Sequence, residues 1–427
     1  MKNFDAVIIG AGPAGTATAL FLAKQGYRVV VLDQAEFPRD KVCGEFISPA
    51  ADAIFAELGV LALLEAQSSL RLNGVYISAY GKSEVCVDYP PMPGRTGRVT
   101  SLSVPRMVLD NVLLQQARRM GAEVRERHKV HDLLFHDGRV VGVKGWDGQK
   151  IPFTLKARVV VDAGGRNCVS IRRLNLRQAA KGSGKIALAA HWRGARFREN
   201  YCYMHVSPPG YTGIASVGGG SVNVVLVVDS RLLEGRDSEE FYLRAVLGNP
   251  RRRQLLADAA PAEKPRTVES LAYSVKSPAC GGLALVGDAM GFIDPFTGEG
   301  IYLSLRSAQM AAQTVDSAFK TSDFSRRRFA GYEAVRRAEF HKKFVLSRTL
   351  QQLIYKPRLC VRVVKILAEN PSLAERLVGV IGDYLPAETV VSVKFLARLA
   401  AGAIRPAEKD LRAWRNRLQL SGKSWKP

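Results

Sequence analysis

Short and almost wholly apolar segments mark the beginning of the chain. Residues 4–9 form the first of these segments and residues 27–32 form the second. A run of this kind, with little polar alternation, is typical of a parallel β-strand that is buried on both faces. Residues 16–25, which lie between the two runs, are predicted to form a helix that ends at Gly26. The pattern therefore predicts a strand, a turn, a helix and a second strand at the start of an α/β fold.

Two later regions have different patterns. Residues 185–229 contain segments rich in β-branched and aromatic residues, which predict a β-sheet. Its strands are expected at 186–192, 201–206 and 223–228. Beyond residue 331 the spacing is helical, with apolar faces and many Lys and Arg residues. Helices are expected there at 332–349, 357–368, 372–381 and 387–403, followed by a polar tail at 410–427.

The turn after the first strand carries the first chemical signal. Its six residues, starting at Gly10, read GAGPAG. A G-x-G-x-x-G turn between a strand and a helix indicates dinucleotide binding when an acidic residue follows about 20 residues later, and Asp33 fulfils this condition. Gly10 permits the tight turn, Gly12 lets the backbone approach a pyrophosphate, and Gly15 lets the helix pack closely on the strand. The helix N-terminus, with Ala14 in its first turn, faces the anion, and Asp33 is expected to accept a hydrogen bond from a ribose hydroxyl.

A second glycine-rich segment follows far downstream. The apolar run 283–286 predicts a strand, and it leads into residues 287–300, which read GDAMGFIDPFTGEG. A helix is predicted at 301–319. Such a helix presents its positive N-terminal end to whatever lies at the turn, and that arrangement suits a cofactor that becomes anionic when reduced, as flavin does.

This second segment resembles the G-D-A-x(n)-P-x-x-G-x-G sequence of FAD enzymes of the p-hydroxybenzoate-hydroxylase type. The resemblance implies that Asp288, next to Gly287, holds the ribityl chain and the pyrophosphate of FAD. It implies that Pro295 lies beside the flavin ring. It also implies that the turn with Gly298 and Gly300 opens a helix whose N-terminus points at the ring. FAD is therefore the expected cofactor.

Two further segments extend the resemblance. Residues 104–120 resemble the family's R-x-x-L-D-x-x-L helix, which implies that Arg106 contacts the cofactor. Residues 158–167 correspond to the family's D-G segment, which implies that Asp162 serves the FAD. A Gly-Gly pair at 164–165 replaces the usual D-G pair. The electron donor therefore stays open between NAD(P)H and a separate reductase.

The fold class that follows is α/β, with a Rossmann-type FAD-binding region, a mixed β-sheet substrate region and a helical C-terminal region. The FAD-binding region is expected at 1–180, completed by 265–330. The substrate region is expected at 181–264 and the basic helical region at 331–427.

The loop after the first β-α-β unit reads RDKVCGE at residues 39–45. It resembles the same stretch of the geranylgeranyl reductases, which implies that Cys43 lies near the flavin. A thiol in that place protonates or deprotonates a substrate carbon, or simply packs. Glu45 is a candidate general acid or base if it is partly buried. The six cysteines have no spacing typical of a metal site, so no metal is expected.

Aromatic residues of the segment 201–211 are candidate substrate contacts. Because alternate residues of a strand face the same side, Tyr201, Tyr203 and His205 are expected to line one wall of the cavity, with Tyr211 close by. His205 is a candidate catalytic base, and a purely structural histidine is the alternative. The segment lacks the W-x-W-x-I-P sequence of flavin halogenases, which argues against halogenation. His191 is expected to be an ordinary strand residue.

The charge of the chain bears on its partners. The 427 residues have a formal net charge of +23 at pH 7, and the last 97 contain 19 Lys and Arg residues against 8 Asp and Glu. Such a surface is either merely solvated or attracts an acidic protein or an anionic membrane surface. Nothing resembles a nucleic-acid-binding module. Residues 6–23 are uncharged but are interrupted by glycines and a proline, so no membrane span is expected. A cytoplasmic protein, free or in peripheral contact with a membrane, is expected.

Three reactions are compatible with these residues. The leading interpretation is a flavin monooxygenase that hydroxylates an aromatic or hydrophobic substrate, with Pro295 shaping the site where oxygen reacts. The second is the reduction of carbon–carbon double bonds in a prenyl or polyketide chain. Cys43 favours this reaction, whereas the absence of the Trp and the Phe-Pro pair of the Y-x-W-x-F-P sequence of prenyl reductases argues against it. The third extends the first to a side chain of an acidic protein, because flavoproteins that mature tryptophylquinone-bearing proteins belong to the same superfamily.

Overall fold

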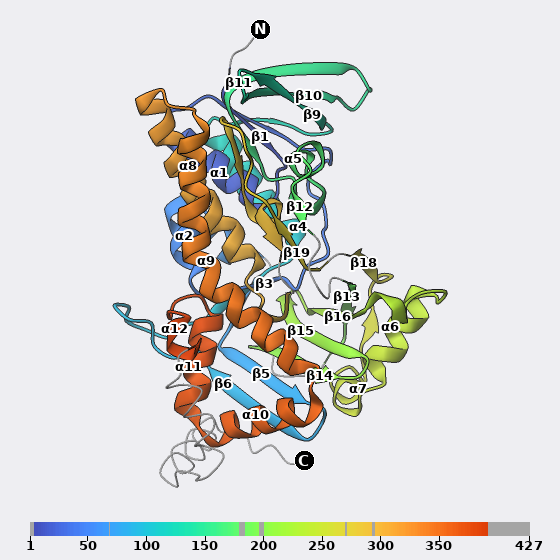
Figure 1. Cartoon of the computed structure of the whole chain (residues 1–427). Helices are drawn as coiled ribbons and strands as arrows, with labels where there is room; N and C mark the ends of the chain where they lie inside the picture. The colour runs from blue at the N-terminus through green and yellow to red at the C-terminus, as the bar shows by residue number, and fades with distance from the viewer. Residues whose placement is uncertain are drawn as a thin grey trace.

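The computed structural model describes residues 4–67, 69–178, 184–195, 200–269, 271–292 and 295–391. Two large β-sheets and a set of long helices organise this part of the chain (Figure 1). One sheet lies towards the N-terminal end of the molecule and the other lies below it in the view of Figure 1. The fold is α/β, as predicted from the sequence pattern.

The first sheet has seven strands in the order β8-β2-β1-β11-β10-β9, with β20 paired to β11. The strands β8, β2, β1, β11 and β20 are parallel, as expected for buried apolar runs without alternation. The strands β9 and β10 extend β11 as an antiparallel hairpin layer. The bounds are β1 Phe4–Ile9, β2 Val29–Leu32, β8 Glu123–Arg125, β9 Lys129–His136, β10 Arg139–Trp146, β11 Pro152–Asp162 and β20 Leu283–Leu285.

Helices cover the parallel part of this sheet. Helix α1 is buried along most of its length because it packs between the sheet and the helices α4 and α8. It begins at Pro13, whose missing N–H is no loss in the first turn of a helix. The bounds are α1 Pro13–Lys24, α2 Ala51–Leu58, α3 Leu61–Glu65, α4 Arg106–Arg119, α5 Val169–Arg173 and α8 Gly300–Thr321.

The second sheet has eight strands in the order β17-β13-β16-β15-β14-β5-β6, with β18 paired to β13. The expected strands are present, and β15 lies between two of them as a further strand that the pattern analysis missed. The hairpin of β5 and β6 comes from the range assigned to the cofactor-binding region, yet it joins this sheet through parallel pairing of β5 with β14. The bounds are β5 Gly74–Ala79, β6 Ser83–Asp88, β13 Lys185–Arg193, β14 Tyr201–Ser207, β15 Gly210–Gly218, β16 Ser221–Asp229, β17 Ala260–Pro261 and β18 Arg266–Glu269.

The two faces of the second sheet bury different partners. Helices α6 and α7 pack on one face, around Trp192 and Tyr242. The opposite face forms an apolar cluster with the C-terminal helices α10 and α11, and helix α10 lies against β5 and β6 (Figure 1). The bounds are α6 Ser238–Leu247, α7 Pro250–Leu255, α9 Arg326–Ile354, α10 Pro357–Glu369, α11 Pro371–Ile381 and α12 Glu388–Val391.

The predicted C-terminal helices agree with the structure within the described residues. Helix α9 is longer than the predicted segment 332–349 because Ser325 caps its N-terminus and the helix continues to Ile354. The expected helix at 387–403 corresponds to α12 at its start, and its remainder lies outside the described residues, as does the predicted tail at 410–427.

Two small sheets and four 3-10 turns connect the large sheets. Strand β7 pairs with both β3 and β4, and strand β19 pairs with both β12 and β21. The bounds are β3 Phe46–Ile47, β4 Leu70–Leu72, β7 Ser101–Ser103, β12 Arg177–Gln178, β19 Tyr273–Val275, β21 Gly291–Phe292, η1 Gly165–Asn167, η2 Ser230–Leu232, η3 Gly287–Met290 and η4 Pro295–Thr297. Of the helices described, none has both the length and the apolar content needed to cross a membrane.

Helix α9 is tied to the first sheet by one buried hydrogen bond. The Tyr332 hydroxyl donates to the Leu285 carbonyl at 2.8 Å. We expect Tyr332→Phe to lower the free energy of unfolding by about 1 kcal/mol, because the carbonyl loses its partner inside the protein. The measurement is a urea unfolding curve of the FAD-loaded protein. Val335→Ala on the exposed face of the same helix is the control and should change stability by less than about 0.5 kcal/mol. Equal effects of the two substitutions would contradict the assignment.

Candidate functional site

The glycines of the turn between β1 and α1 differ in the space beside them. A Cβ atom on Gly15 would lie 1.8 Å from the Gly10 carbonyl oxygen, so the packing of the helix requires glycine there. Gly10 has a φ of +93°, which also favours glycine. A Cβ atom on Gly12 would meet only the end of the Arg39 side chain, at 3.7 Å. The open side of Gly12 belongs to the large cavity, together with Pro13 and Ala14.

A second hollow lies on the other side of this turn. It is lined by the carboxyl ends of β1 and β2, including Gly10 and Asp33, and by Val130 of β9. The Asp33 carboxylate accepts hydrogen bonds from the Ala11 N–H at 2.7 Å and from the Ala35 N–H at 2.8 Å. The two hollows together provide space for an extended ligand that crosses the glycine turn, with Asp33 in the second hollow.

Asp162 and Asp288 have different places. Asp162 is fully buried and accepts from the Gly164 and Ser170 N–H groups at 3.0 and 2.9 Å, so it holds the turn after β11 in shape. Its side chain is absent from the lining of both hollows. Asp288 faces the large cavity, and its carboxylate lies 3.5 Å from the Arg166 guanidinium. Gly287 has a φ of +60° and brings this turn against Ala14, whose Cβ would be 2.8 Å from a Cβ at position 287.

The turn before α8 forms another side of the cavity. Gly298 has a φ of +73°, and a Cβ atom there would lie 2.7 Å from the Phe46 ring. Gly300 has no protein atom closer than 4.0 Å to a Cβ position, so its open side faces the cavity at the N-terminus of α8. Pro295 begins the 3-10 turn that precedes these glycines, and nothing further is described of its side chain.

The loop with Cys43 lies between the two large sheets. The Cys43 sulfur accepts from the Glu45 N–H at 3.3 Å, and the Cys43 carbonyl accepts from the Asn223 side-chain amide of β16 at 2.7 Å. Burial raises the pKa of the Cys43 thiol. The side chain of Cys43 lines the large cavity, so a protonated thiol faces the space where a ligand would lie.

Glu45 is not a cavity residue but a buried connector behind the loop. It has a left-handed φ of +55° and is 1% exposed. One carboxylate oxygen accepts from the Arg106 N–H at 2.8 Å, and the other lies 2.8 Å from His191 Nε2. His191 Nδ1 lies 2.9 Å from Glu263, which reaches the surface. The hydrogen bond with Glu45 is the main cause that raises the pKa of His191 to about 9, and Glu263 adds to it.

The same region contains a group with metal-ligand geometry among the described residues. Asp40, His191 and Glu263 place one ligand atom each within 4.8 Å of the others. The Arg266 guanidinium lies 2.9 Å from Asp40 and 3.5 Å from Glu263, so a cation already balances these carboxylates.

Cationic side chains gather at the polar end of the cavity. Arg106 is buried and binds Asp110 through two hydrogen bonds of 2.9 and 2.8 Å. Lys41 lines the cavity, and no described carboxylate lies within 4 Å of its ammonium group. Burial, followed by the repulsion from Arg106, lowers the pKa of Lys41. Cations that line the same cavity as Gly12 and the N-terminus of α1 form a site suited to an anion such as a pyrophosphate.

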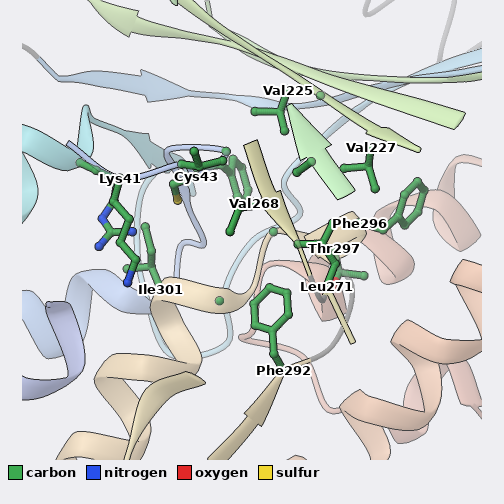
Figure 2. Close-up of a pocket in the computed structure, with 18 of the residues that line it drawn as sticks. Lys41, Cys43, Val225, Val227, Val268, Leu271, Phe292, Phe296, Thr297 and Ile301 are labelled. Carbon is green, nitrogen blue, oxygen red and sulfur yellow. The ribbon is translucent and has the colours of Figure 1, made fainter. Parts of the chain in front are cut away.

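The other end of the cavity is apolar. Figure 2 shows Lys41 at one end and Phe296 at the opposite end, with the side chains of Val225 and Phe292 facing each other across the space. Strands β14, β15, β16 and β18 and the end of α11 provide most of this lining. Its apolar members are Val75, Met204, Tyr211, Ile214, Val225, Val227, Val268, Leu271, Phe292, Phe296 and Ile381.

Three of the aromatic residues expected in the cavity point away from it. Cys202 and Met204 of β14 line the cavity, so Tyr201, Tyr203 and His205 lie on the opposite face of the strand. The expected alternation was correct, but the face was wrong because sequence alone does not say which side of a strand the cavity occupies. The Tyr201 hydroxyl donates to Asp88 at 2.6 Å, and Tyr203 packs in the core towards α6.

The neighbours of His205 explain its burial without a catalytic role. Neither ring nitrogen has a hydrogen-bond partner among the described residues. Burial, with repulsion from Arg252 and Arg251, lowers its pKa to about 3. A base with this environment and without access to the cavity does not serve a ligand there. Tyr211 does line the cavity, where its ring meets the Phe296 ring edge-on.

Several cavity residues carried no sequence signal of their own. Lys41 lies inside the RDKVCGE segment, and its place at the cavity wall is information that only the fold provides. His191 lies in strand β13, as predicted, and it also joins Glu45 to Glu263 near the surface. The apolar residues of β16 and β18 read as plain strand residues in the sequence.

Comparison with known proteins identifies the ligand of this site. A family described as FAD binding domain matches residues 3–341. The open side of Gly12, the two hollows on either side of the turn and the cations at the cavity wall fit this dinucleotide. FAD is therefore the cofactor, and Gly12, Lys41, Arg106 and Asp288 all line the cavity in which it would bind.

Curated relatives include both reductases and halogenases. The chain is 28% identical over 413 residues to a menaquinone reductase of Mycolicibacterium smegmatis, covering 94% of this chain and 97% of the relative. It is 24% identical over 414 residues to a digeranylgeranylglycerophospholipid reductase of Methanocella arvoryzae, covering 89% of this chain and all of the relative (100%).

Solved structures share the fold. The structure of the flavin-dependent brominase Bmp2 superposes with a TM-score of 0.78 at 20% sequence identity, covering 89% of this chain and 94% of the brominase. At this identity the likeness concerns the arrangement of the sheets and helices, and it says nothing about the reaction.

The open side of Gly12 yields a test of the FAD site. We expect Gly12→Ala to fold normally, because the nearest protein atom would be 3.7 Å from the new methyl group. The methyl group would occupy the space that the pyrophosphate needs, so the affinity for FAD should fall by about tenfold or more, equivalent to about 1.4 kcal/mol. FAD fluorescence titration of the apoprotein measures this, with circular dichroism to confirm folding. Gly331→Ala on helix α9, which also has open space around it, is the matched control and should keep the wild-type affinity.

The raised pKa of His191 predicts a pH dependence of stability. A histidine with a pKa of about 9 in the folded state and about 6.5 when unfolded stabilises the fold fully below about pH 6.5. This contribution is lost as the pH rises through about 9. We therefore expect the melting temperature of His191→Gln to fall below that of the wild type at pH 6 to a greater extent than at pH 10. A difference that stays constant over this pH range would show that the ring is not charged in the folded protein.

Proposed function

The chain belongs to the FAD-binding-domain family and is an FAD-dependent oxidoreductase, and we propose that its reaction is the reduction of carbon–carbon double bonds in an isoprenoid-like hydrocarbon chain. The observation that carries this proposal is the division of the cavity. Its charged residues stand at the pyrophosphate end, and its substrate end is lined by aliphatic and aromatic side chains. A hydrocarbon chain gains free energy at about 25 cal/mol per Å² on entering such a space.

The division of the cavity favours a hydrocarbon over a polar aromatic acid. Among the described residues, the strands of the second sheet contribute no Lys, Arg, Asp or Glu to the lining, and Arg166, which lies over the Phe292 ring at 4.5 Å, comes from the first sheet's side of the cavity. Burial of a carboxylate or a phenolate against these strands would cost several kcal/mol without a partner. The two relatives that match the chain almost end to end are named as reductases, one of menaquinone and one of a geranylgeranyl lipid, and both substrates contain isoprenoid chains.

Cys43 is the proposed proton donor. When bound, reduced FAD supplies a hydride to one carbon of the double bond. The Cys43 thiol supplies a proton to the other carbon, so both carbons end saturated. Its raised pKa keeps the sulfur protonated at neutral pH, which a donor requires. The hydrogen bonds that the loop makes with Glu45 and Asn223 hold the sulfur at the cavity wall. A nicotinamide nucleotide or a separate reductase protein restores the two electrons of the cofactor.

Oxygen chemistry is the second candidate, and the shape of the cavity is the observation that favours it. The N-terminus of α8 and the apolar walls would exclude water from the reaction of reduced FAD with oxygen, as the hydroxylation hypothesis requires. This hypothesis assigns the substrate contact to Tyr211 and gives Cys43 only a packing role. The hydroxylation hypothesis also extends to a side chain of an acidic protein as the substrate, and this extension stays a prediction. The docking of the basic C-terminal region on a membrane or an acidic partner is likewise a prediction.

Cys43 gives the experiment that separates the two reactions. We expect the FAD-loaded protein, reduced by dithionite without oxygen, to saturate double bonds of a geranylgeranyl lipid or of menaquinone. Cys43→Ala should lower the rate by about 100-fold, because a positioned general acid contributes about that factor or more. Mass spectrometry of the extracted lipid counts the hydrogens added.

The controls separate loss of the proton donor from loss of the cofactor. Cys43→Ala should retain bound FAD, measured by its absorbance, and Cys86→Ser on strand β6 should keep the wild-type rate. The reductase proposal would be wrong if the wild-type protein left both lipids unchanged. If it also consumed oxygen while it hydroxylated an aromatic compound, the oxygen hypothesis would take its place.

A further inference from the structure

A buried carboxyl group lies directly behind the turn that faces the flavin. Glu299 stands between Gly298 and Gly300, which both line the cavity. Its own side chain turns the other way, into a small hollow between α8 and α9. Glu299 is 4% exposed although it carries an ionisable group. The backbone of one turn therefore has the flavin on one side and a buried acid on the other.

The acid is held by hydroxyl groups and not by a direct ion pair. One Glu299 oxygen accepts from the Thr297 hydroxyl at 3.2 Å and from the Ser347 hydroxyl of α9 at 3.3 Å. Lys343 of α9 is near enough to attract the carboxylate, but its ammonium group contacts Asp383 after α11. Burial is the main cause that raises the pKa of Glu299 to about 7, and Lys343 and the two hydroxyls oppose this shift.

Charged and titratable groups surround Glu299 on every element that packs against it. They belong to α8, α9, the residues after α11 and the turn η3. These groups are Tyr302, Arg306, Glu339, Lys343, Asp383 and Asp288. Glu339 is paired with Arg306 at 2.6 Å, and Lys343 with Asp383. Glu299 thus has no direct ion pair among the described residues, and the cation that attracts it, Lys343, is in contact with Asp383.

We propose that Glu299 takes up a proton when FAD at the adjacent turn is reduced and releases it when FAD is oxidised. Two electrons added with one proton leave a negative charge on the cofactor. That charge lies at the N-terminal turn of α8 and disfavours a second negative charge on Glu299, so the carboxylate binds a proton from solvent and becomes neutral. The proposal rests on FAD binding alone and is independent of the substrate and of the role of Cys43.

The consequence is a coupling between pH and the midpoint potential of the cofactor. Over the pH interval in which Glu299 is ionised beside oxidised FAD and neutral beside reduced FAD, one more proton accompanies the two electrons. The midpoint potential of the wild type then falls by about 30 mV more per pH unit than outside that interval, since tenfold in a two-electron equilibrium is 29.6 mV. Glu299→Gln has no carboxyl group to titrate, so its potential should lack the steeper interval and lie above that of the wild type at the alkaline end.

The experiment measures the midpoint potential of FAD in the holoprotein against reference dyes between about pH 6 and about pH 9, the range around the pKa of Glu299. Wild type, Glu299→Gln and Glu369→Gln are compared. Glu369 is a surface carboxylate at the end of α10, so its substitution changes the net charge equally and should leave the pH dependence of the wild type intact. Equal pH dependence in the wild type and Glu299→Gln, or the same change in Glu369→Gln, would overturn the proposal.

A second measurement covers the case in which Glu299→Gln fails to retain FAD. Ser347→Ala removes one hydroxyl that stabilises the carboxylate and leaves the acid in place. The steeper interval should then move to higher pH, and an unchanged interval would contradict the proposal. The infrared difference spectrum between reduced and oxidised wild type should also show the carbonyl band of a protonated carboxylic acid. Its absence at a pH inside the interval would likewise overturn the assignment.

Discussion

The hydrogen bonds of the Glu45 carboxylate join the parts of the molecule that must meet at the cofactor. One oxygen binds the first N–H of helix α4, and the other binds His191 of strand β13 in the second sheet. The peptide N–H of Glu45 binds the sulfur of Cys43. Burial of the Glu45 carboxylate without partners would lower the stability of the fold by several kcal/mol, so the fold requires both of its hydrogen bonds. The position of Cys43 at the cavity wall is therefore fixed by contacts that lie outside the cavity.

The glycine turns place a second constraint on the same site. Gly15, Gly287 and Gly298 bring backbone segments closer than any side chain allows, and each is in contact with another element that lines the cavity or supports it. Gly12 and Gly300 differ, because the space beside them is open. Close packing at the first group of glycines creates the shape of the site, and the open space at the second group is what FAD fills. This is why one motif contains glycines with two different physical purposes.

Sequence analysis predicted FAD and the glycine turns that follow β1 and β20 because their signal is local. Gly10, Gly12 and Asp288 stand at fixed offsets from apolar strands, and the strands themselves are short runs that any buried parallel sheet requires. The direction of the β14 side chains could not be obtained in this way, because alternation defines two faces but not which of them meets the cavity. Likewise the link from His191 to Glu45 joins residues 146 positions apart, and no local pattern records such a contact. The substrate walls arise from β-strands whose valines look alike whether they face a core or a ligand.

Two buried glutamates now stand on different sides of the flavin site with opposite electrostatic surroundings. Glu45 has a histidine and a peptide N–H as direct partners, so its environment supplies positive charge at hydrogen-bond distance. Glu299 has two neutral hydroxyls, and its nearest cation is engaged by Asp383. A carboxyl group of the first kind is suited to hold structure, because its two oxygens bind two different elements of the fold. One of the second kind is suited to change its charge, because neither form has a decisive advantage near neutral pH. The fold thus separates a carboxyl group that ties α4 and β13 together beside the Cys43 loop from one that lies among neutral hydroxyls behind the turn at the N-terminus of α8, and the second is the one for which we propose a response to the electrons of FAD.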